Sequence, residues 1–169
     1  AACRIYSDFH TRLKDKMKSY EDNLKMFIKE LIRNVDYISS CSDDTVEEVS
    51  YYCQHEFYEK DTILFRGGEP IDRIYFIVSG KVNITVNVYD IDIVVDTLYQ
   101  GWLIGLNGIL GDFSHNFTAR AISNTSVYCL TKDSLKALIN TWEDLDKNVY
   151  YWRKYYEKSF MPYVDFRLY

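Results

Sequence analysis

The hydrophobic pattern of this chain of 169 residues changes period twice, and this change restricts its fold more than any other feature. Up to Tyr52, apolar residues recur every three or four positions, as on one face of a helix. Between Cys53 and Thr131 they alternate with polar residues, and turn residues such as Gly80 and Gly101 recur at short intervals. Helical spacing returns after Thr131. The pattern therefore predicts an antiparallel β section between two helical sections.

The β section is predicted to contain eight short strands. They are expected near residues 53–58, 62–65, 73–79, 81–88, 91–99, 102–105, 117–122 and 126–131. Eight strands within about 80 residues cannot form an open sheet without exposing unpaired edges, so a closed roll is expected. The hairpin "RIYFIVSGKVNITV", from Arg73 to Val86, is its most regular part.

Two helices are predicted before the β section. The first runs from about Asp8 to Asn34. Its apolar residues, at spacings of three and four, form a face that must pack against another part of the protein. These residues are Leu24, Phe27, Ile28, Leu31, Ile32 and Val35. The second helix is expected to begin after Ser42, a suitable N-cap, and to run toward Tyr52.

Two more helices are predicted after the β section. Thr131 and Asp133 begin a short one, and Thr141 with Asp144 begins a longer one that Pro162 should stop. The final stretch "YVDFRLY" alternates like a short strand. The predicted fold class is therefore α+β: an eight-stranded antiparallel β-roll (jelly roll) flanked by N-terminal helices and two C-terminal helices.

Composition and charge exclude several classes of function. The chain has 25 acidic and 20 basic side chains, a net charge of −5, so no nucleic-acid partner is expected. No apolar run approaches the roughly 20 residues that span a bilayer, so this segment is not expected to insert into a membrane. The four cysteines are far apart, which favours reduced thiols and no metal site. The three histidines are scattered without a nucleophile motif, so no catalytic residues and no enzyme are expected.

Several stretches resemble the cyclic nucleotide-binding domain. "YEKDTILFRGGEPIDRIYFIVSGKV" (58–82) resembles its opening strands, and "GWLIGL" (101–106) resembles the run into its phosphate-binding cassette. "FTARA" (117–121) and "VYCLTKDSLKALI" (127–139) resemble the strands and the helix after that cassette. The resemblance implies a domain at residues 41–161. Residues 1–40 then resemble the end of a channel C-linker, and residues 162–169 form a C-terminal tail.

The resemblance also implies a binding site from which both charged anchors are missing. In the family, a Glu after the cassette glycine binds the ribose and a later Arg binds the cyclic phosphate. Here Gly105 matches the glycine, Leu106 takes the Glu position, His115 takes the Arg position and Asn116 the neighbouring Thr position. The backbone cradle would consist of Gly105, Leu106, Asn107, Gly108 and Ile109. Cyclic AMP or cyclic GMP is therefore expected to bind weakly or not at all, and no other cofactor is expected.

Alternative interpretations of the glycines and of Arg120 are weaker. Gly105, Gly108 and Gly111 have the spacing GxxGxxG without a parallel strand and long helix, so a dinucleotide loop is disfavoured. Arg120 lies an odd number of residues after His115, so it should point to the other face of its strand.

The C-terminal region is expected to cover the pocket. By resemblance, the last helix is the family's lid, with Trp152 and Tyr156 on its apolar side, although constant core packing would explain the same stripe. The tail is hypothesised to act as an intrinsic ligand through Tyr163, Phe166 or Leu168, as in the ether-à-go-go-like potassium channels, whose similar domains have lost their anchors.

The resemblance implies a regulatory domain on the cytoplasmic side of a membrane protein, or in the cytoplasm. The expected parent is a tetrameric cation channel of the potassium type, with the N-terminal helices contacting other channel subunits. Two alternatives stay open: a non-signalling interaction module within a larger assembly, and a regulatory domain of a cyclic nucleotide-dependent kinase.

Overall fold

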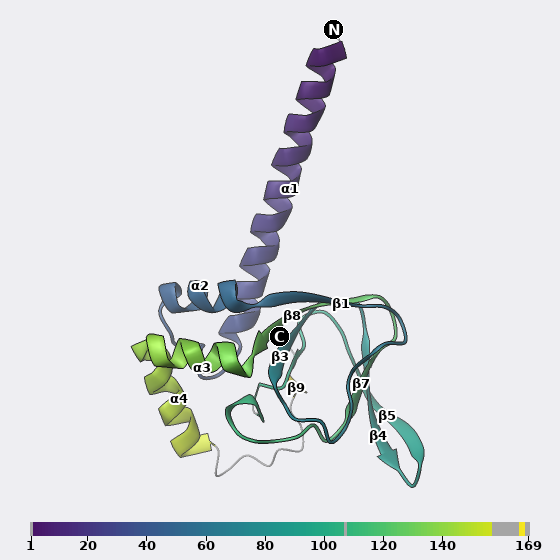
Figure 1. The fold of residues 1–169 in the computed structure, drawn as a ribbon, viewed down its shortest axis with the longest axis vertical. Coiled ribbons are helices and arrows are strands. Elements are labelled where there is room, and N and C mark those ends of the chain that lie inside the picture. The colour runs from purple at the N-terminus through teal and green to yellow at the C-terminus, as the bar shows by residue number, and fades with distance from the viewer. Residues whose placement is uncertain (1, 107, 157–165, 168–169) are drawn as a thin grey trace.

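The protein was studied as a computed structural model, which describes residues 2–106, 108–156 and 166–167. A β-roll lies at the centre, and helix α1 (Ala2–Arg33) extends away from it as a long rod (Figure 1). The other three helices gather on one side of the roll, and the hairpin of β4 (Val82–Val88) and β5 (Ile91–Leu98) protrudes on another (Figure 1).

Apart from the start of the first helix, the helices begin close to the predicted positions. They are α1 (Ala2–Arg33), α2 (Asp43–Tyr52), α3 (Lys132–Thr141) and α4 (Glu143–Tyr156). Ser42 caps α2 and Thr131 caps α3, since each side chain accepts a hydrogen bond from the third residue after it. The predicted start of the first helix at Asp8 is wrong: no Gly or Pro interrupts the preceding residues, and the helix begins at Ala2. The predicted stop at Pro162 lies outside the described residues.

All eight predicted strands are present. They are β1 (Gln54–Tyr58), β2 (Ile63–Phe65), β3 (Arg73–Ser79), β4 (Val82–Val88), β5 (Ile91–Leu98), β6 (Leu103–Ile104), β7 (Thr118–Ala121) and β8 (Thr125–Thr131). A short ninth strand, β9 (Phe166–Arg167), falls in the tail, and a 3-10 turn, η1 (Gly108–Leu110), follows β6. One sheet has the order β1-β8-β3-β6-β9 and the other β2-β7-β4-β5. Every strand pair is antiparallel, as the α+β roll predicts.

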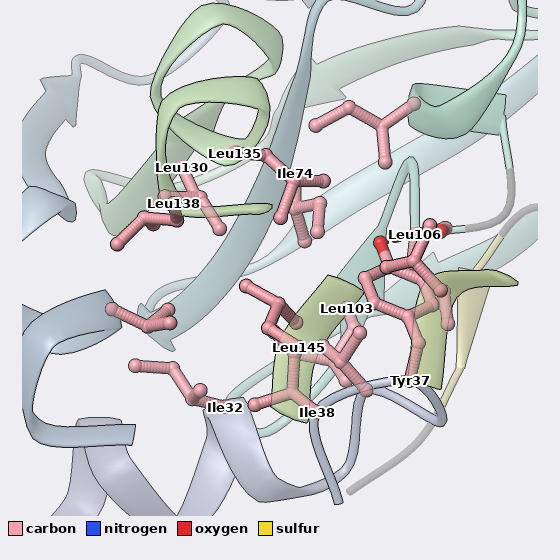
Figure 2. Close-up of a cluster of buried hydrophobic side chains, with 14 of the residues drawn as sticks. Ile32, Tyr37, Ile38, Ile74, Leu103, Leu106, Leu130, Leu135, Leu138 and Leu145 are labelled. Atoms are coloured by element: carbon pink, nitrogen blue, oxygen red, sulfur yellow. Dashed lines mark hydrogen bonds between the residues drawn. The ribbon is translucent and has the colours of Figure 1, made fainter. Parts of the chain in front are cut away.

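Two hydrophobic cores lie on opposite faces of the first sheet. Strand β3 separates them, because Ile74 and Phe76 point to the helices while Tyr75 and Ile77 point into the roll. The helical core, shown in Figure 2, includes buried residues of α1 and of the loop after it, such as Ile32 and Ile38. The end of α1 and the loop after it, residues 28–38, therefore pack as part of the domain's own core.

Within the described part of the chain, none of the helices combines the length and apolar character that crossing a bilayer requires.

Candidate functional site

The cassette begins with a glycine that no other residue could replace without strain. Gly105 follows β6 and has a φ of +90°, in the left-handed region. A β carbon there would collide with the backbone carbonyl of Arg73. The chain then forms the single turn η1, in which the Ile109 amide donates to the Gly105 carbonyl at 3.1 Å. That amide of the predicted cradle is therefore already used within the turn.

Leu106, at the position of the family's Glu, is fully buried in the helical core. Figure 2 shows it beside Tyr37, whose hydroxyl donates to the Leu106 carbonyl at 3.0 Å. The position is thus part of a packed apolar interior, where a carboxylate would lose its hydration without gaining a partner.

His115, at the position of the family's Arg, is buried in the roll with 3% of its surface exposed. Its ring stacks on Phe65, with centroids 3.5 Å apart and an interplanar angle of 13°. Burial lowers the pKa of His115 from 6.5 to about 4, although the nearby carboxylates of Asp72 and Glu69 act in the opposite direction. The side chain is therefore neutral at pH 7 and offers no charge to a phosphate.

The backbone around His115 is fixed by hydrogen bonds to the loop between β2 and β3. Its amide donates to the Glu69 carbonyl at 2.8 Å, and its carbonyl accepts from the Gly68 amide at 2.8 Å. The ring nitrogen Nδ1 is buried and has no hydrogen-bond partner among the residues that the structure describes.

A pocket of about 460 Å³ opens beside His115. It is lined by Tyr58, Leu64, Phe65, Glu69, Pro70, Asp72, Arg73, Tyr75 and His115. The guanidinium of Arg73 in this pocket already forms two ion pairs. Its Nη1 lies 2.6 Å from a Glu56 carboxylate oxygen, and its Nε lies 3.0 Å from an Asp72 carboxylate oxygen. An anion in this pocket would therefore meet the Glu69 and Asp72 carboxylates and an arginine whose charge is already compensated.

Of the other predicted cassette residues that the structure describes, none lines this pocket. Asn116 is exposed, and Asn107 lies outside the described residues. Gly108 and Ile109 are buried in η1. Arg120 is exposed and donates to the Asp61 carbonyl at 3.1 Å, so it does not replace the missing arginine.

The lid position is occupied by a packed helix. Trp152 of α4 is buried and contacts the Tyr37 ring edge-on, with centroids 5.8 Å apart. Arg153 donates to the Leu110 carbonyl of the cassette at 2.9 Å. Tyr156 belongs to α4 by its backbone, but its side chain is not described.

The two described residues of the tail lie at the edge of the sheet next to the cassette. The backbone of Phe166 pairs with Ile104, and that of Arg167 pairs with Leu103. The strand-like interpretation of the tail is therefore confirmed at these two residues. Tyr163 and Leu168, the other candidates for an intrinsic ligand, lie outside the described residues.

Sequence reasoning missed Phe65, Arg73 and Tyr37 as neighbours of the site. Arg73 could have been found, because it alternates with Tyr75 and Ile77 on the inward face of β3. The hydrogen bond between Tyr37 and Leu106 had no local signal in the sequence, since the two residues are far apart in the chain.

In the described part of the structure, no cluster of three or more potential metal ligands occurs.

A β-roll with a cassette between β6 and β7, followed by two helices, is the arrangement of a class of regulatory domains. The sequence model of the cyclic nucleotide-binding domain matches residues 55–141, and the chain belongs to this family.

Individual relatives are distant. The chain is 23% identical over 123 residues to human cGMP-dependent protein kinase 2, covering 70% of this chain but only 16% of that kinase. A cyclic nucleotide-binding domain from Methylobacillus flagellatus superposes with a TM-score of 0.65 at 18% identity, covering 85% of this chain and 88% of that one. The regulatory domain of Toxoplasma gondii PKA with cAMP gives 0.63 at 21% identity, covering 69% and 44%. These structures share the fold.

Proposed function

We propose that this chain is a regulatory domain that binds cyclic AMP and cyclic GMP weakly or not at all and acts through its packing against other parts of its parent protein. The observation that carries the proposal is the state of the two anchor positions. Leu106 is built into the helical core, and His115 is buried and stacked on Phe65. Neither position presents a charge to a ligand.

The absence of both charged anchors removes a large part of the free energy of nucleotide binding. A hydrogen bond to a charged group contributes on the order of 1.5–3 kcal/mol, so losing two weakens binding by about a hundredfold or more. The carboxylates of Glu69 and Asp72 beside His115 make the pocket still less suited to a phosphate.

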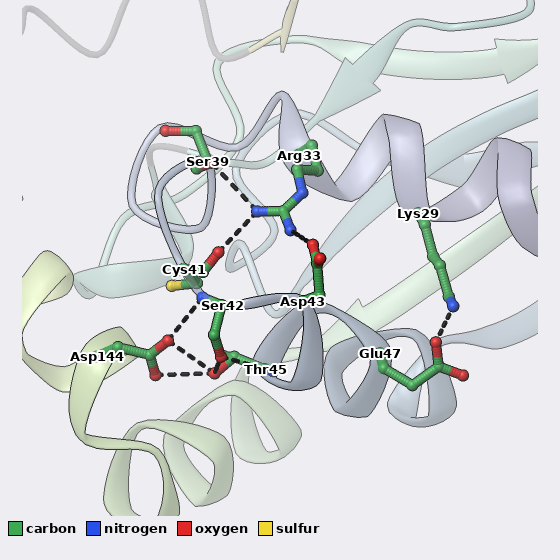
Figure 3. Close-up of polar contacts among 9 residues, drawn as sticks. All are labelled: Lys29, Arg33, Ser39, Cys41, Ser42, Asp43, Thr45, Glu47 and Asp144. Carbon is green, nitrogen blue, oxygen red and sulfur yellow. Dashed lines mark hydrogen bonds and ion pairs between the residues drawn. The ribbon is translucent and has the colours of Figure 1, made fainter.

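The structure offers a route by which the cassette could act on α1. Tyr37 lies just after α1, donates to the Leu106 carbonyl and contacts Trp152 of α4. Arg33, at the end of α1, donates to the carbonyls of Ser39 and Cys41 and pairs with Asp43, as Figure 3 shows. A shift of the cassette or of α4 would therefore be passed to α1 through tight polar and aromatic contacts.

The tail supports a further part of the proposal. Strand β9 pairs with β6, directly before the cassette, and this proximity of Phe166 and Arg167 supports an intrinsic ligand. In this proposal, one or more of Tyr163, Phe166 and Leu168 substitute for nucleotide.

For the parent protein, we propose a tetrameric cation channel of the potassium type, with this domain on the cytoplasmic side and no catalytic activity of its own. The N-terminal helices would contact neighbouring subunits. The similarity to a cGMP-dependent kinase favours a kinase regulatory domain as a second candidate. A non-signalling interaction module is the third candidate.

The coding sequence on either side of this segment distinguishes these candidates. Six hydrophobic spans upstream support the channel, and a kinase catalytic domain supports the second candidate.

Isothermal titration calorimetry with cyclic AMP and cyclic GMP tests the binding proposal. We expect the native chain to give no binding with a Kd below about 100 μM. Micromolar binding of either nucleotide would show that the proposal is wrong.

Restoring the anchors provides the positive control. The double variant Leu106→Glu with His115→Arg should bind more tightly than the native chain if it remains folded. Because Leu106 is buried in the helical core, thermal unfolding must accompany the titration. The single variant His115→Arg avoids a carboxylate in that core, and it should bind more tightly than the native chain even if the double variant unfolds.

A further inference from the structure

The projecting part of α1, residues 7–23, exposes an apolar face that nothing in the described structure covers. Every side chain from residue 7 to residue 23 is exposed. Among them are Leu13, Met17 and Tyr20, with 45%, 56% and 69% of their surfaces accessible. Three large apolar side chains on one exposed helix face indicate a contact surface.

These residues continue a heptad pattern that is already used in packing. Leu13, Met17, Tyr20, Leu24, Phe27 and Leu31 follow one another at alternating spacings of four and three, which places them at successive d and a positions. Leu31 is buried, and Leu24 and Phe27 pack partly against the helical core. These six residues therefore form one apolar seam along α1. The seam packs on the domain near the C-terminal end of α1 and is exposed toward the N-terminal end.

The opposite face of the projecting part is polar throughout. Its b, c and f positions are Asp8, Thr11, Arg12, Asp15, Lys18, Ser19 and Asp22. A narrow apolar seam with a polar back is the pattern of a two-stranded coiled coil and not of a helix buried on several sides.

A helix of this kind is only marginally stable when it stands alone in water. In Figure 1, α1 extends well beyond the rest of the molecule. Packing of the exposed seam against another helix would supply the missing stabilisation.

We propose that the projecting part of α1 pairs in parallel with α1 of a second copy of this chain. The flanking charges favour this occupant and orientation. Lys16 is at a g position and Glu21 at the e position of the next heptad, which is the pair that meets across a parallel, in-register coiled coil. Lys16 would then face Glu21 of the partner subunit, and the symmetric contact would form as well. The inference goes beyond the proposed function and does not depend on nucleotide binding.

Sedimentation velocity on the full 169-residue chain tests the pairing. We expect the mass of two chains at micromolar concentration. The variant Met17→Lys should shift the chain to a monomer, because it places a charge in the seam. The matched control Met26→Lys changes an equally exposed methionine of the same helix, 62% accessible but outside the seam, and should leave the dimer intact. A native chain that sediments as a monomer or a tetramer overturns the proposal, as does equal weakening by the two variants.

Charge reversal tests the orientation. Lys16→Glu or Glu21→Lys alone should weaken association by about threefold or more, because each creates two repulsive pairs across the seam. The double variant, Lys16→Glu with Glu21→Lys, should restore the native affinity. Circular dichroism of each variant controls for lost helicity. Failure of the double variant to restore association, with helicity unchanged, would rule out the parallel, in-register arrangement.

Discussion

At the scale of single residues, His115 makes the stability of the domain depend on pH. Burial lowers its pKa from 6.5 to about 4, so between these values the unfolded chain binds a proton that the folded chain does not. Folding is therefore favoured fully above pH 6.5 and loses free energy as the pH falls toward 4. We expect a loss of about 3 kcal/mol across this window from His115 alone. Urea unfolding at a series of pH values measures it.

The variant His115→Phe isolates this contribution. Phenylalanine can keep the stack on Phe65 but cannot take up a proton, and the carboxylates that titrate in the same range remain. The unfolding free energy of the variant should fall less steeply between pH 6.5 and 4 than that of the native chain. Identical slopes would mean that His115 takes up a proton as readily in the folded state as in the unfolded chain.

His115 also shows which features of the site could be predicted from the sequence and which could not. The absence of Arg at position 115 is visible in the sequence. The stack on Phe65 and the pairing of Arg73 with Glu56 are not, because they join side chains from separate segments. Glu56 and Arg73 lie on β1 and β3, which do not pair with each other but both pair with β8. Only the order of strands in the sheet brings them together.

At the scale of secondary-structure elements, Asp144 joins the start of α4 to the start of α2. Its carboxylate accepts hydrogen bonds from the Ser42 amide and the Thr45 hydroxyl at 2.8 Å, as Figure 3 shows. It also accepts one from the Leu145 amide at 2.9 Å. Burial opposes its charge, but these hydrogen bonds together lower the pKa of Asp144 below its ordinary value. The variant Asp144→Ala should therefore lower the free energy of unfolding by about 1–3 kcal/mol.

Asp146 provides the matched control for this prediction. It lies in the same first turn of α4 but is exposed, so Asp146→Ala removes a similar charge near the helix N-terminus without breaking the contact to α2. Urea unfolding should show a clearly smaller loss for Asp146→Ala. Comparable losses would indicate that Asp144 acts through the helix dipole alone.

The elements themselves were more predictable than the contacts between them. Alternation placed the ends of β3, β4 and β5 within one residue, because the side-chain period of a strand is short and turn residues bound each strand. The linkage of α2 to α4 through Asp144 could not be predicted, since Asp144 serves equally well as an ordinary acidic residue in a first turn.

At the scale of the whole molecule, Tyr37 connects the three parts that a regulatory domain must couple. It comes after α1, donates to the Leu106 carbonyl of the cassette at 3.0 Å, and contacts Trp152 of α4. The variant Tyr37→Phe removes the hydrogen bond and keeps the ring contact, so it should lower the free energy of unfolding by about 1 kcal/mol. If Tyr37 couples these parts, amide hydrogen exchange should accelerate in the cassette and in α4, while β4 and β5 stay unchanged.

Tyr150→Phe controls for the loss of a tyrosine hydroxyl, since Tyr150 lies on α4 with 60% of its surface exposed. It should leave the exchange pattern unchanged. An acceleration confined to the residues next to Tyr37, or spread evenly over the roll, would show that the contact is only local packing. Acceleration in both the cassette and α4 would instead identify the hydrogen bond between Tyr37 and Leu106 as a link between the cassette and α4.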